Sequence, residues 1–310
     1  MPNIPGRQIA SKTMVTLPRR SAHRRNAHHP AVLATVAGVL LAFVVLVLPQ
    51  PAEPGSWFPG DEVADSLVGR WIDAVGGMET YHEFQSAAFT VTTVLYDTVT
   101  GRIRRSRPRY VWIKKGPYGE QSRIERWEGA GLIQQGFNGR DPAWAAVEGE
   151  LLPDTAKDTR EALYVSRDVF YWFGLPFKLR DPGVYLQYLG LRERPGAEWS
   201  GEAGSPTRAP DGLYHAVGVS FGVGVGEHQD VFTYYFAPDN PLPHETTYVE
   251  EGKTSLNRMV WGEIDRAGQI EYPYAVRRDF LTESGKRTKA LVVSDVVVNP
   301  ETPQQKFERP

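Results

Sequence analysis

Short segments of alternating β-branched and aromatic residues occupy most of the chain after residue 86, and several are apolar on both faces. The clearest is "VFTYYF" (231–236), which ends in the turn residues Pro, Asp and Asn. Successive side chains of a strand point to opposite faces, so one face carries Phe232, Tyr234 and Phe236 and the other Val231, Thr233 and Tyr235. A strand without a polar face needs a covering layer on both sides. Which of its rows points inward is left open by the sequence.

The order of the elements predicts an α+β fold with one strongly curved antiparallel sheet. A helical pattern at 62–75 and a shorter one at 79–84 precede the strands, and a third at 158–177 interrupts them. Helices and strands do not alternate, so a parallel sheet is excluded. We expect ten to twelve strands, with helices closing the concave face. That face would hold a helix, a ligand or both. A thick ordinary core remains the alternative.

The N-terminal part predicts a membrane anchor. Residues 31–48 form an unbroken apolar run, and a helix of that length spans about 27 Å, close to the hydrocarbon core of a bilayer. The preceding segment, 1–30, carries six Arg and Lys and no acid, which places it in the cytoplasm. We interpret 31–48 as an uncleaved signal anchor, with a signal peptide as the alternative. Residues 49–61 form a Pro/Gly linker, and 62–310 form the folded domain on the other side of the membrane.

Composition excludes several classes of function. The chain has no cysteine, so disulfides, thiolate zinc sites and cysteine nucleophiles are excluded. After residue 50, 29 basic residues face 37 acidic ones, which argues against a nucleic-acid partner. Seven of those 29 lie with Tyr110 and Trp112 in the segment 101–116. An outward cationic face or attraction to anionic lipid headgroups explains them better than a nucleic-acid platform.

No catalytic or metal-binding motif is present, and we predict no enzyme activity and no cofactor. The segment "GVGVGE" (222–227) has strand patterns on both sides, which indicates a hairpin instead of a phosphate loop. No H-x-x-x-H spacing occurs, and the G-x-S-x-G match "GVSFG" (218–222) lies in a strand pattern and not at a strand-to-helix turn. A hydrolase with a polar cluster near His228 and Asp230 is the enzyme alternative.

A family resemblance rests on four segments in order. These are "AVGGMETYHEFQS", "SRPRYVWIKK" followed by "GFNGRDPAW", "PFKLRDPGVYLQYLG", and the closing "VVVNPETPQQKFERP". Together they resemble the LolA/LolB-like superfamily, in particular an uncharacterised outer membrane lipoprotein-sorting protein branch. The resemblance implies an incomplete barrel (half-barrel) of eleven strands that binds lipoprotein acyl chains beneath a helical lid. It also implies a lid contact for Arg107 and a closing segment with Asn299, Pro300 and Phe307.

The predicted function is lipid or acyl-chain binding without chemistry, in lipoprotein trafficking or lipid sensing. The protein would be a single-pass protein of the bacterial inner membrane with its domain in the periplasm. A fixed anchor and the missing lipidation cysteine favour a tethered station over a diffusing carrier. An RseB-like envelope-stress regulator with a protein partner is the alternative. The candidate residues of the hydrophobic cavity are Phe89, Val91, Trp112, Trp127, Phe137, Trp144, Trp172, Phe173, Phe232, Tyr234 and Phe236.

Overall fold

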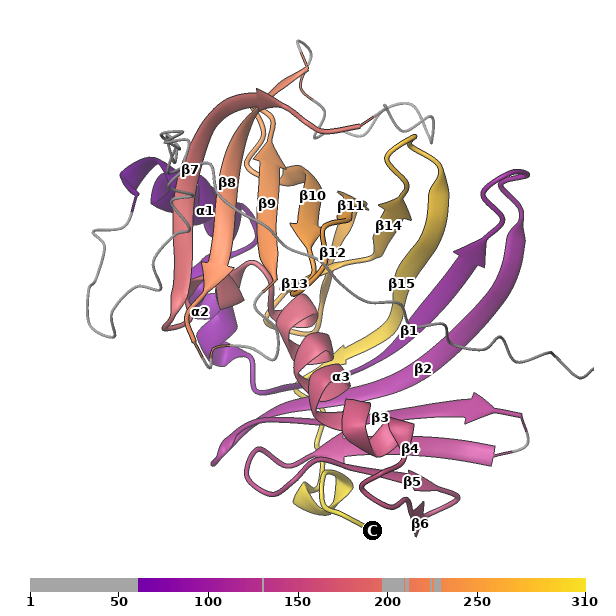
Figure 1. Ribbon diagram of the computed structural model, residues 1–310. Helices are drawn as coiled ribbons and strands as arrows, with labels where there is room; N and C mark the ends of the chain where they lie inside the picture. Colours follow the sequence, from indigo (N-terminus) through magenta and orange to yellow (C-terminus); the bar gives the residue numbers. More distant parts are fainter. Residues whose placement is uncertain (1–60, 130, 197–208, 210–211, 224, 226–229) are drawn as a thin grey trace, which may run out of the picture. The chain divides into compact units, whose positions relative to one another are not determined.

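One antiparallel sheet of thirteen strands organises the domain (Figure 1), in the order β6-β5-β4-β3-β2-β1-β15-β14-β11-β10-β9-β8-β7. The computed structural model describes residues 61–129, 131–196, 209, 212–223, 225 and 230–310. A separate two-stranded sheet pairs β12 with β13. The α+β class with a large antiparallel sheet is confirmed. The expected count of about eleven strands is too low.

The elements have the following bounds. The helices are α1 (Glu62–Ala74), α2 (Gly77–Glu83) and α3 (Lys157–Gly174), with 3-10 turns at Phe177–Arg180 and Gln304–Lys306. The first strands are β1 (Ser86–Tyr96), β2 (Ile103–Gly116), β3 (Gly119–Glu128), β4 (Gly131–Phe137), β5 (Trp144–Val147), β6 (Glu150–Leu151) and β7 (Val184–Glu193). The remaining strands are β8 (Leu213–Phe221), β9 (Val231–Phe236), β10 (Pro243–Val249), β11 (Leu256–Trp261), β12 (Ile264–Ala267), β13 (Tyr272–Ala275), β14 (Arg277–Leu281) and β15 (Arg287–Val298).

The two short strands β5 and β6 extend one edge of the sheet. The segment "YPYAVRRDFL" (272–281) forms two strands that belong to different sheets. Its first half, β13, pairs with β12, and its second half, β14, joins the main sheet between β11 and β15. Pro273 lies in β13. Because proline has no N–H to donate, it suits a small edge hairpin better than a central strand.

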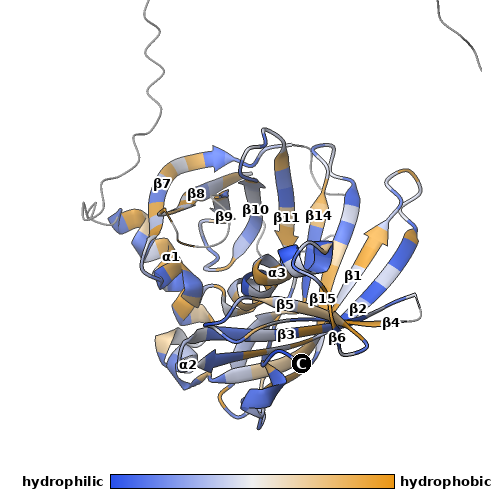
Figure 2. Ribbon diagram, turned by 60° about the horizontal axis from the view of Figure 1, so that its bottom comes forward, coloured by the Kyte–Doolittle hydropathy of each residue, from blue (hydrophilic) through white to orange (hydrophobic). Residues whose placement is uncertain are grey.

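The sheet curves around α3, which lies on its concave side (Figures 1 and 2). α1 covers the same side near β9 to β11, where the Trp71 ring lies 5.6 Å from that of Tyr234 and 5.5 Å from that of Trp261. The expected closure of the concave face by helices is therefore observed. Both helices contribute to one hydrophobic core.

α1 begins at Asp61, whose side chain accepts hydrogen bonds from the backbone N–H groups of Val63 and Ala64. Its buried face contains Leu67 and Trp71, whereas Val63 is 46% exposed and does not join the predicted apolar stripe. The helix ends before Gly76, which has a φ of 116° that favours glycine.

The two rows of β9 lie in different layers. Phe232, Tyr234 and Phe236 belong to the concave core. On the convex side Tyr235 packs with Tyr214 in a second cluster. Exposure differs along that side, because Tyr235 is 7% exposed and Val231 is 53% exposed. The row of Phe232, Tyr234 and Phe236 is therefore the one that points to the concave side.

The predicted cytoplasmic segment 1–30, the anchor 31–48 and the linker, apart from its last residue, lie outside the described residues. Within the part of the chain that the structure describes, no helix is both long enough and apolar enough to cross a membrane.

Candidate functional site

α3 presents an aromatic face to the concave side of the sheet. Phe173 stacks on Phe89 of β1, with ring centroids 4.4 Å apart, and on Tyr272 of β13 at 5.4 Å. One residue earlier, Trp172 lies 5.9 Å from Phe232 of β9. Stacked and edge-to-face rings stabilise such contacts beyond their buried area. The helix thus bridges strands that are distant in the sheet.

A small cavity of about 30 Å³ remains between α3 and the sheet. Its lining comprises Phe89, Val91, Arg109, Asp168, Val169, Trp172, Phe173, Tyr274, Ala275, Arg278, Leu291 and Val293. Space of this size suits about one water molecule, whereas ligand pockets measure roughly 300–1,000 Å³. With α3 in this position the concave face is filled by the protein's own side chains. A long apolar ligand therefore requires α3 to move.

Charged side chains face this cavity from three elements. Arg109 comes from β2, Arg278 from β14 and Asp168 from α3. Arg278 is only 6% exposed, and its Nε and Nη1 atoms have no hydrogen-bond acceptor among the residues that the structure describes; the Nε of Arg109 also lacks one there. The Arg278 guanidinium lies 4.7 Å from the Trp172 ring centroid. A buried cation without acceptors is unfavourable for folding.

The electrostatics reflect this burial. Burial lowers the pKa of Arg278 to about 10, against the attraction of Asp168. Lys289 of β15 also has a lowered pKa, because of burial first and the nearby Arg278 and Arg109 as well. Burial raises the pKa of the Asp168 carboxyl, which Arg278 and Arg109 oppose. Asp168 accepts a 2.7 Å hydrogen bond from Trp172 Nε1. Among the described residues, two cations and one acid thus line the cavity, and Lys289 lies beside them on β15, opposite Leu95 of β1.

The contact between α3 and the sheet contains other unsatisfied polar atoms. The hydroxyls of Thr159 and Ser166 on α3 are buried without a hydrogen-bond partner in the described ranges of the chain. Near the start of the helix, Asp158 forms an ion pair with Arg126 and its carbonyl accepts from Gln135 Nε2 at 2.8 Å. Asp158 therefore fixes the first turn through polar contacts, while the hydroxyls of Thr159 in that turn and of Ser166 further along the helix are left unsatisfied.

Seven of the candidate cavity residues share the concave core or line the cavity. Phe89, Val91, Trp172 and Phe173 line the cavity, and Phe232, Tyr234 and Phe236 lie in the core beside it. Phe137 contacts the Arg167 guanidinium of α3 at 5.8 Å. The structure brings these residues together around α3.

The remaining candidate residues lie elsewhere. Trp127 is 64% exposed. Trp112 contacts Lys306 of the C-terminal segment, whose ammonium lies 3.6 Å from its ring centroid, and Trp144 Nε1 donates to the Phe307 carbonyl at 3.4 Å. Arg107 is exposed on β2.

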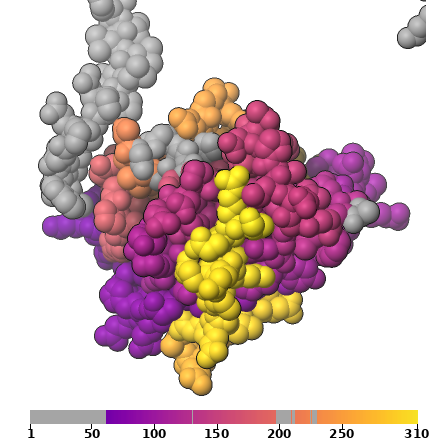
Figure 3. Space-filling view, turned by 90° about the horizontal axis from the view of Figure 1, so that it is seen from below, coloured from indigo at the N-terminus to yellow at the C-terminus, as the bar shows by residue number. Residues whose placement is uncertain are grey.

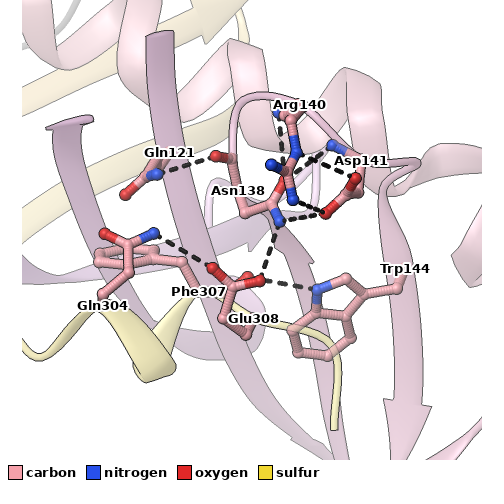
Figure 4. A network of polar contacts seen from close by, with 8 residues as sticks. All are labelled: Gln121, Asn138, Arg140, Asp141, Trp144, Gln304, Phe307 and Glu308. Carbon is pink, nitrogen blue, oxygen red and sulfur yellow. Dashed lines mark hydrogen bonds and ion pairs between the residues drawn. The ribbon is translucent and has the colours of Figure 1, made fainter. Parts of the chain in front are cut away.

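The C-terminal segment covers the outer face of β3 to β5 (Figure 3). Phe307 is fully buried there, and Asn138 Nδ2 donates to Glu308 at 2.9 Å (Figure 4). Asn299 begins the segment, and its Oδ1 accepts from the N–H groups of Gln85 and Ser86 at 2.7 and 3.1 Å. The closing Asn-Pro and Phe residues therefore fasten the chain end to the sheet.

The enzyme alternative centred on two residues. Asp230 accepts a hydrogen bond from the N–H of Glu251 at 2.9 Å. This bond joins the residue before β9 to the turn after β10. His228 lies outside the described residues. Among the residues that the structure does describe, no three His, Cys, Asp or Glu side chains are placed to hold a metal ion.

Sequence reasoning missed Arg109, Asp168, Arg278 and Lys289. One signal for Arg109 was available in the sequence. Arg107 and Arg109 are two residues apart, so they share a face of β2, where they lie opposite Thr93 and Val91 of β1. Asp168 was also recognisable as an acid next to the run "VFYWF". The pairing of β14 with β15, which brings Arg278 opposite Leu291, had no such signal.

Comparison with known proteins gives structural similarities only. No family model matches the chain, and no curated protein matches it. The chain is similar to a DUF1329 family protein from Desulfovibrio piger, with 8% identity, a TM-score of 0.48, and coverage of 79% of this chain and 97% of that one.

The chain is also similar to two further solved structures. A LolA superfamily protein from Nitrosomonas europaea has 12% identity and a TM-score of 0.46, with 79% of this chain and 97% of that one covered. An outer membrane lipoprotein-sorting protein domain from Vibrio parahaemolyticus has 9% identity and a TM-score of 0.44, with coverage of 80% and 96%. LolA-superfamily proteins and lipoprotein-sorting domains are thus among the structures that this chain resembles.

Proposed function

We propose that this protein binds a lipid or a lipoprotein acyl chain on the concave face of its sheet, beneath α3, and performs no chemistry on it. The observation that carries the proposal is the aromatic concave face, which continues from Phe89 on β1 to Phe232 on β9 and is bridged by one helix. Each methylene group removed from water contributes about 0.8 kcal/mol. A single long chain therefore gains useful affinity from this face alone.

Displacement of α3 is the conformational step in this proposal. The helix meets the face through Phe173 and Trp172, and an acyl chain offers equivalent apolar contacts to the strands. The buried hydroxyls of Thr159 and Ser166 have no hydrogen-bond partner, so they gain hydrogen bonds to water when the helix moves out. Both terms reduce the free-energy cost of opening the site.

The cellular setting is part of the proposal. Residues 31–48 would anchor the chain in the bacterial inner membrane, with 62–310 on the periplasmic side, so that lipid reaches the site from a membrane. The chain would act as a tethered station in lipid or lipoprotein trafficking, or as a sensor of these lipids.

Photo-crosslinking in cells tests the proposal. Bacteria that produce the full chain are fed a fatty acid with a diazirine near its end, irradiated, and the purified protein is mapped by peptide mass spectrometry. We expect adducts on peptides that contain Trp172, Phe89 or Phe232, and none on the peptide with the exposed Trp127. Adducts confined to 31–48, or equal labelling of the Trp127 peptide, would contradict binding on the concave face.

A further inference from the structure

The cations around the cavity form a continuous set on the concave side of the sheet. Arg105, Arg107 and Arg109 point to one face of β2, opposite Leu95, Thr93 and Val91 of β1. Lys289 of β15 lies opposite Leu95 from the other side, and Arg278 of β14 lies opposite Leu291. Arg105 and Arg107 are exposed, whereas Arg278 is buried. The set thus extends from the exposed Arg105, near the start of β2, to Arg109 and Arg278 in the cavity beneath α3.

Arg278 and Arg109 carry buried N–H groups that are available to donate hydrogen bonds to a ligand. Arg278 is 94% removed from solvent, yet within the described part of the chain its Nε and Nη1 atoms have no acceptor, and neither has the Nε of Arg109. Both side chains line the same cavity. Burial of a guanidinium without acceptors persists in a stable fold when another role maintains it, and guanidinium forks match the geometry of carboxylate and phosphate oxygens. These unused donors therefore indicate an anionic ligand.

Of the described residues, one acid lines this cavity, and it belongs to α3. Asp168 faces Arg109 and Arg278 across the cavity and is oriented by Trp172 Nε1. Its carboxylate partly neutralises the arginines while the helix is in place. When α3 moves, the arginines lose this charge and an incoming anion replaces it. Asp168 is therefore an internal counter-anion that competes with the ligand.

We propose that Arg109 and Arg278, assisted by Lys289, bind the anionic headgroup of the amphiphile, a phosphate or a carboxylate, and that this headgroup displaces Asp168. This inference rests on the proposed function for the acyl chain and adds the chemistry of the other end of the ligand. The apolar face beside the cavity receives the chain, and the exposed Arg105 and Arg107 guide the headgroup inward.

The test compares three probes that distinguish the contribution of the alkyl chain from that of the headgroup charge. The full chain, held in amphipol, is titrated with hexadecyl phosphate, with hexadecanol and with inorganic phosphate, and bound ligand is counted by native mass spectrometry. We expect hexadecyl phosphate to bind at least about tenfold more tightly than hexadecanol, which corresponds to one or two charge-assisted hydrogen bonds.

Three variants of the cavity residues, two expected to weaken and one expected to tighten the binding of hexadecyl phosphate, test the headgroup site. Arg278→Gln and Arg109→Gln should each remove most of the tenfold preference for hexadecyl phosphate over hexadecanol. Asp168→Asn should tighten hexadecyl phosphate binding several-fold, because the competing charge is gone. Arg104→Gln, an exposed arginine on the same strand as Arg109, is the matched control and should change neither affinity. Thermal melts of each variant establish that it is folded, and Arg109→Gln serves if Arg278→Gln does not fold.

The outcomes separate the two proposals. If hexadecanol and hexadecyl phosphate bind equally to the unchanged protein, the headgroup site is wrong and acyl-chain binding stands. If neither amphiphile binds, the proposed function fails. If inorganic phosphate binds as tightly as hexadecyl phosphate, the arginines hold a free anion and the assignment to a lipid headgroup is overturned.

Discussion

Arg278 shows how a single residue can work against the fold and indicate a function. It is buried beneath α3 with two donor atoms unsatisfied, and burial is the main cause of its lowered pKa. An apolar side chain of similar length would avoid that desolvation. Proteins retain such groups where binding depends on them, because selection maintains stability only above a threshold.

Replacement of Arg278 by methionine should therefore stabilise the domain. We expect the free energy of unfolding to rise by about 1 kcal/mol, or roughly 2–4 °C in Tm for a domain of this size, because desolvation of the charge outweighs its contact with Trp172. Thermal denaturation of the full chain measures it. Arg104→Met, at an exposed position, should leave the Tm unchanged. A lower Tm for Arg278→Met would mean that the contacts with Trp172 and Asp168 dominate.

Among the elements, strand positions were predictable and strand faces were not. The segment "VFTYYF" is a strand with the predicted bounds, β9. Its β-branched and aromatic residues and its flanking turn residues define it locally. By contrast, Trp112 and Trp144 were assigned to the cavity but lie under the C-terminal segment. A strand that is apolar on both faces gives no local signal for the concave side, which depends on where distant segments pack.

α1 is joined to the far edge of the sheet by one carboxylate. Asp61 caps the helix through Oδ1, and its Oδ2 accepts a 2.6 Å hydrogen bond from the N–H of Tyr188 on β7. These bonds favour the ionised form, and the bond from Tyr188 is the largest cause of the lowered pKa of Asp61. A carboxyl with a lowered pKa stabilises the folded state above its unfolded pKa of 3.8, and this contribution is lost as the pH falls through the folded value.

The variant Asp61→Ala should consequently lower the Tm at pH 7, because the cap and the link to β7 are both lost. The difference from the unchanged protein should narrow as the pH is lowered below about 3.8. Melting curves between pH 7 and pH 3 measure this trend. Asp73→Ala, near the end of the same helix, is the matched control and should show no comparable narrowing. If the Tm difference between Asp61→Ala and the unchanged protein stays constant across this range, the ionised carboxylate is not the source of the stabilisation.

For the whole domain, the curved sheet with helices on its concave side followed from the sequence, because so many strands were apolar on both faces. The charged cavity did not follow from it. Arg109, Asp168 and Arg278 are separated by 59 and 110 positions in the sequence, and they meet only because β14 pairs with β15, β15 with β1 and β1 with β2, while α3 crosses the same face. Pairings between distant segments create such a site, and local alternation does not encode them.

The orientation of the whole chain in the membrane is the last prediction. We expect a single crossing by residues 31–48 with the sheet outside the cytoplasm, because the basic residues of 1–30 remain inside. The chain has no cysteine, so one introduced thiol reports its own location. Trp127→Cys, at a 64% exposed position, should react with a membrane-impermeant maleimide in cells with a permeabilised outer membrane. Ser11→Cys, in the basic segment, should react only after the inner membrane is lysed, because it faces the cytoplasm. The reverse pattern would place the sheet in the cytoplasm, where lipid on the periplasmic side of the membrane cannot reach its concave face.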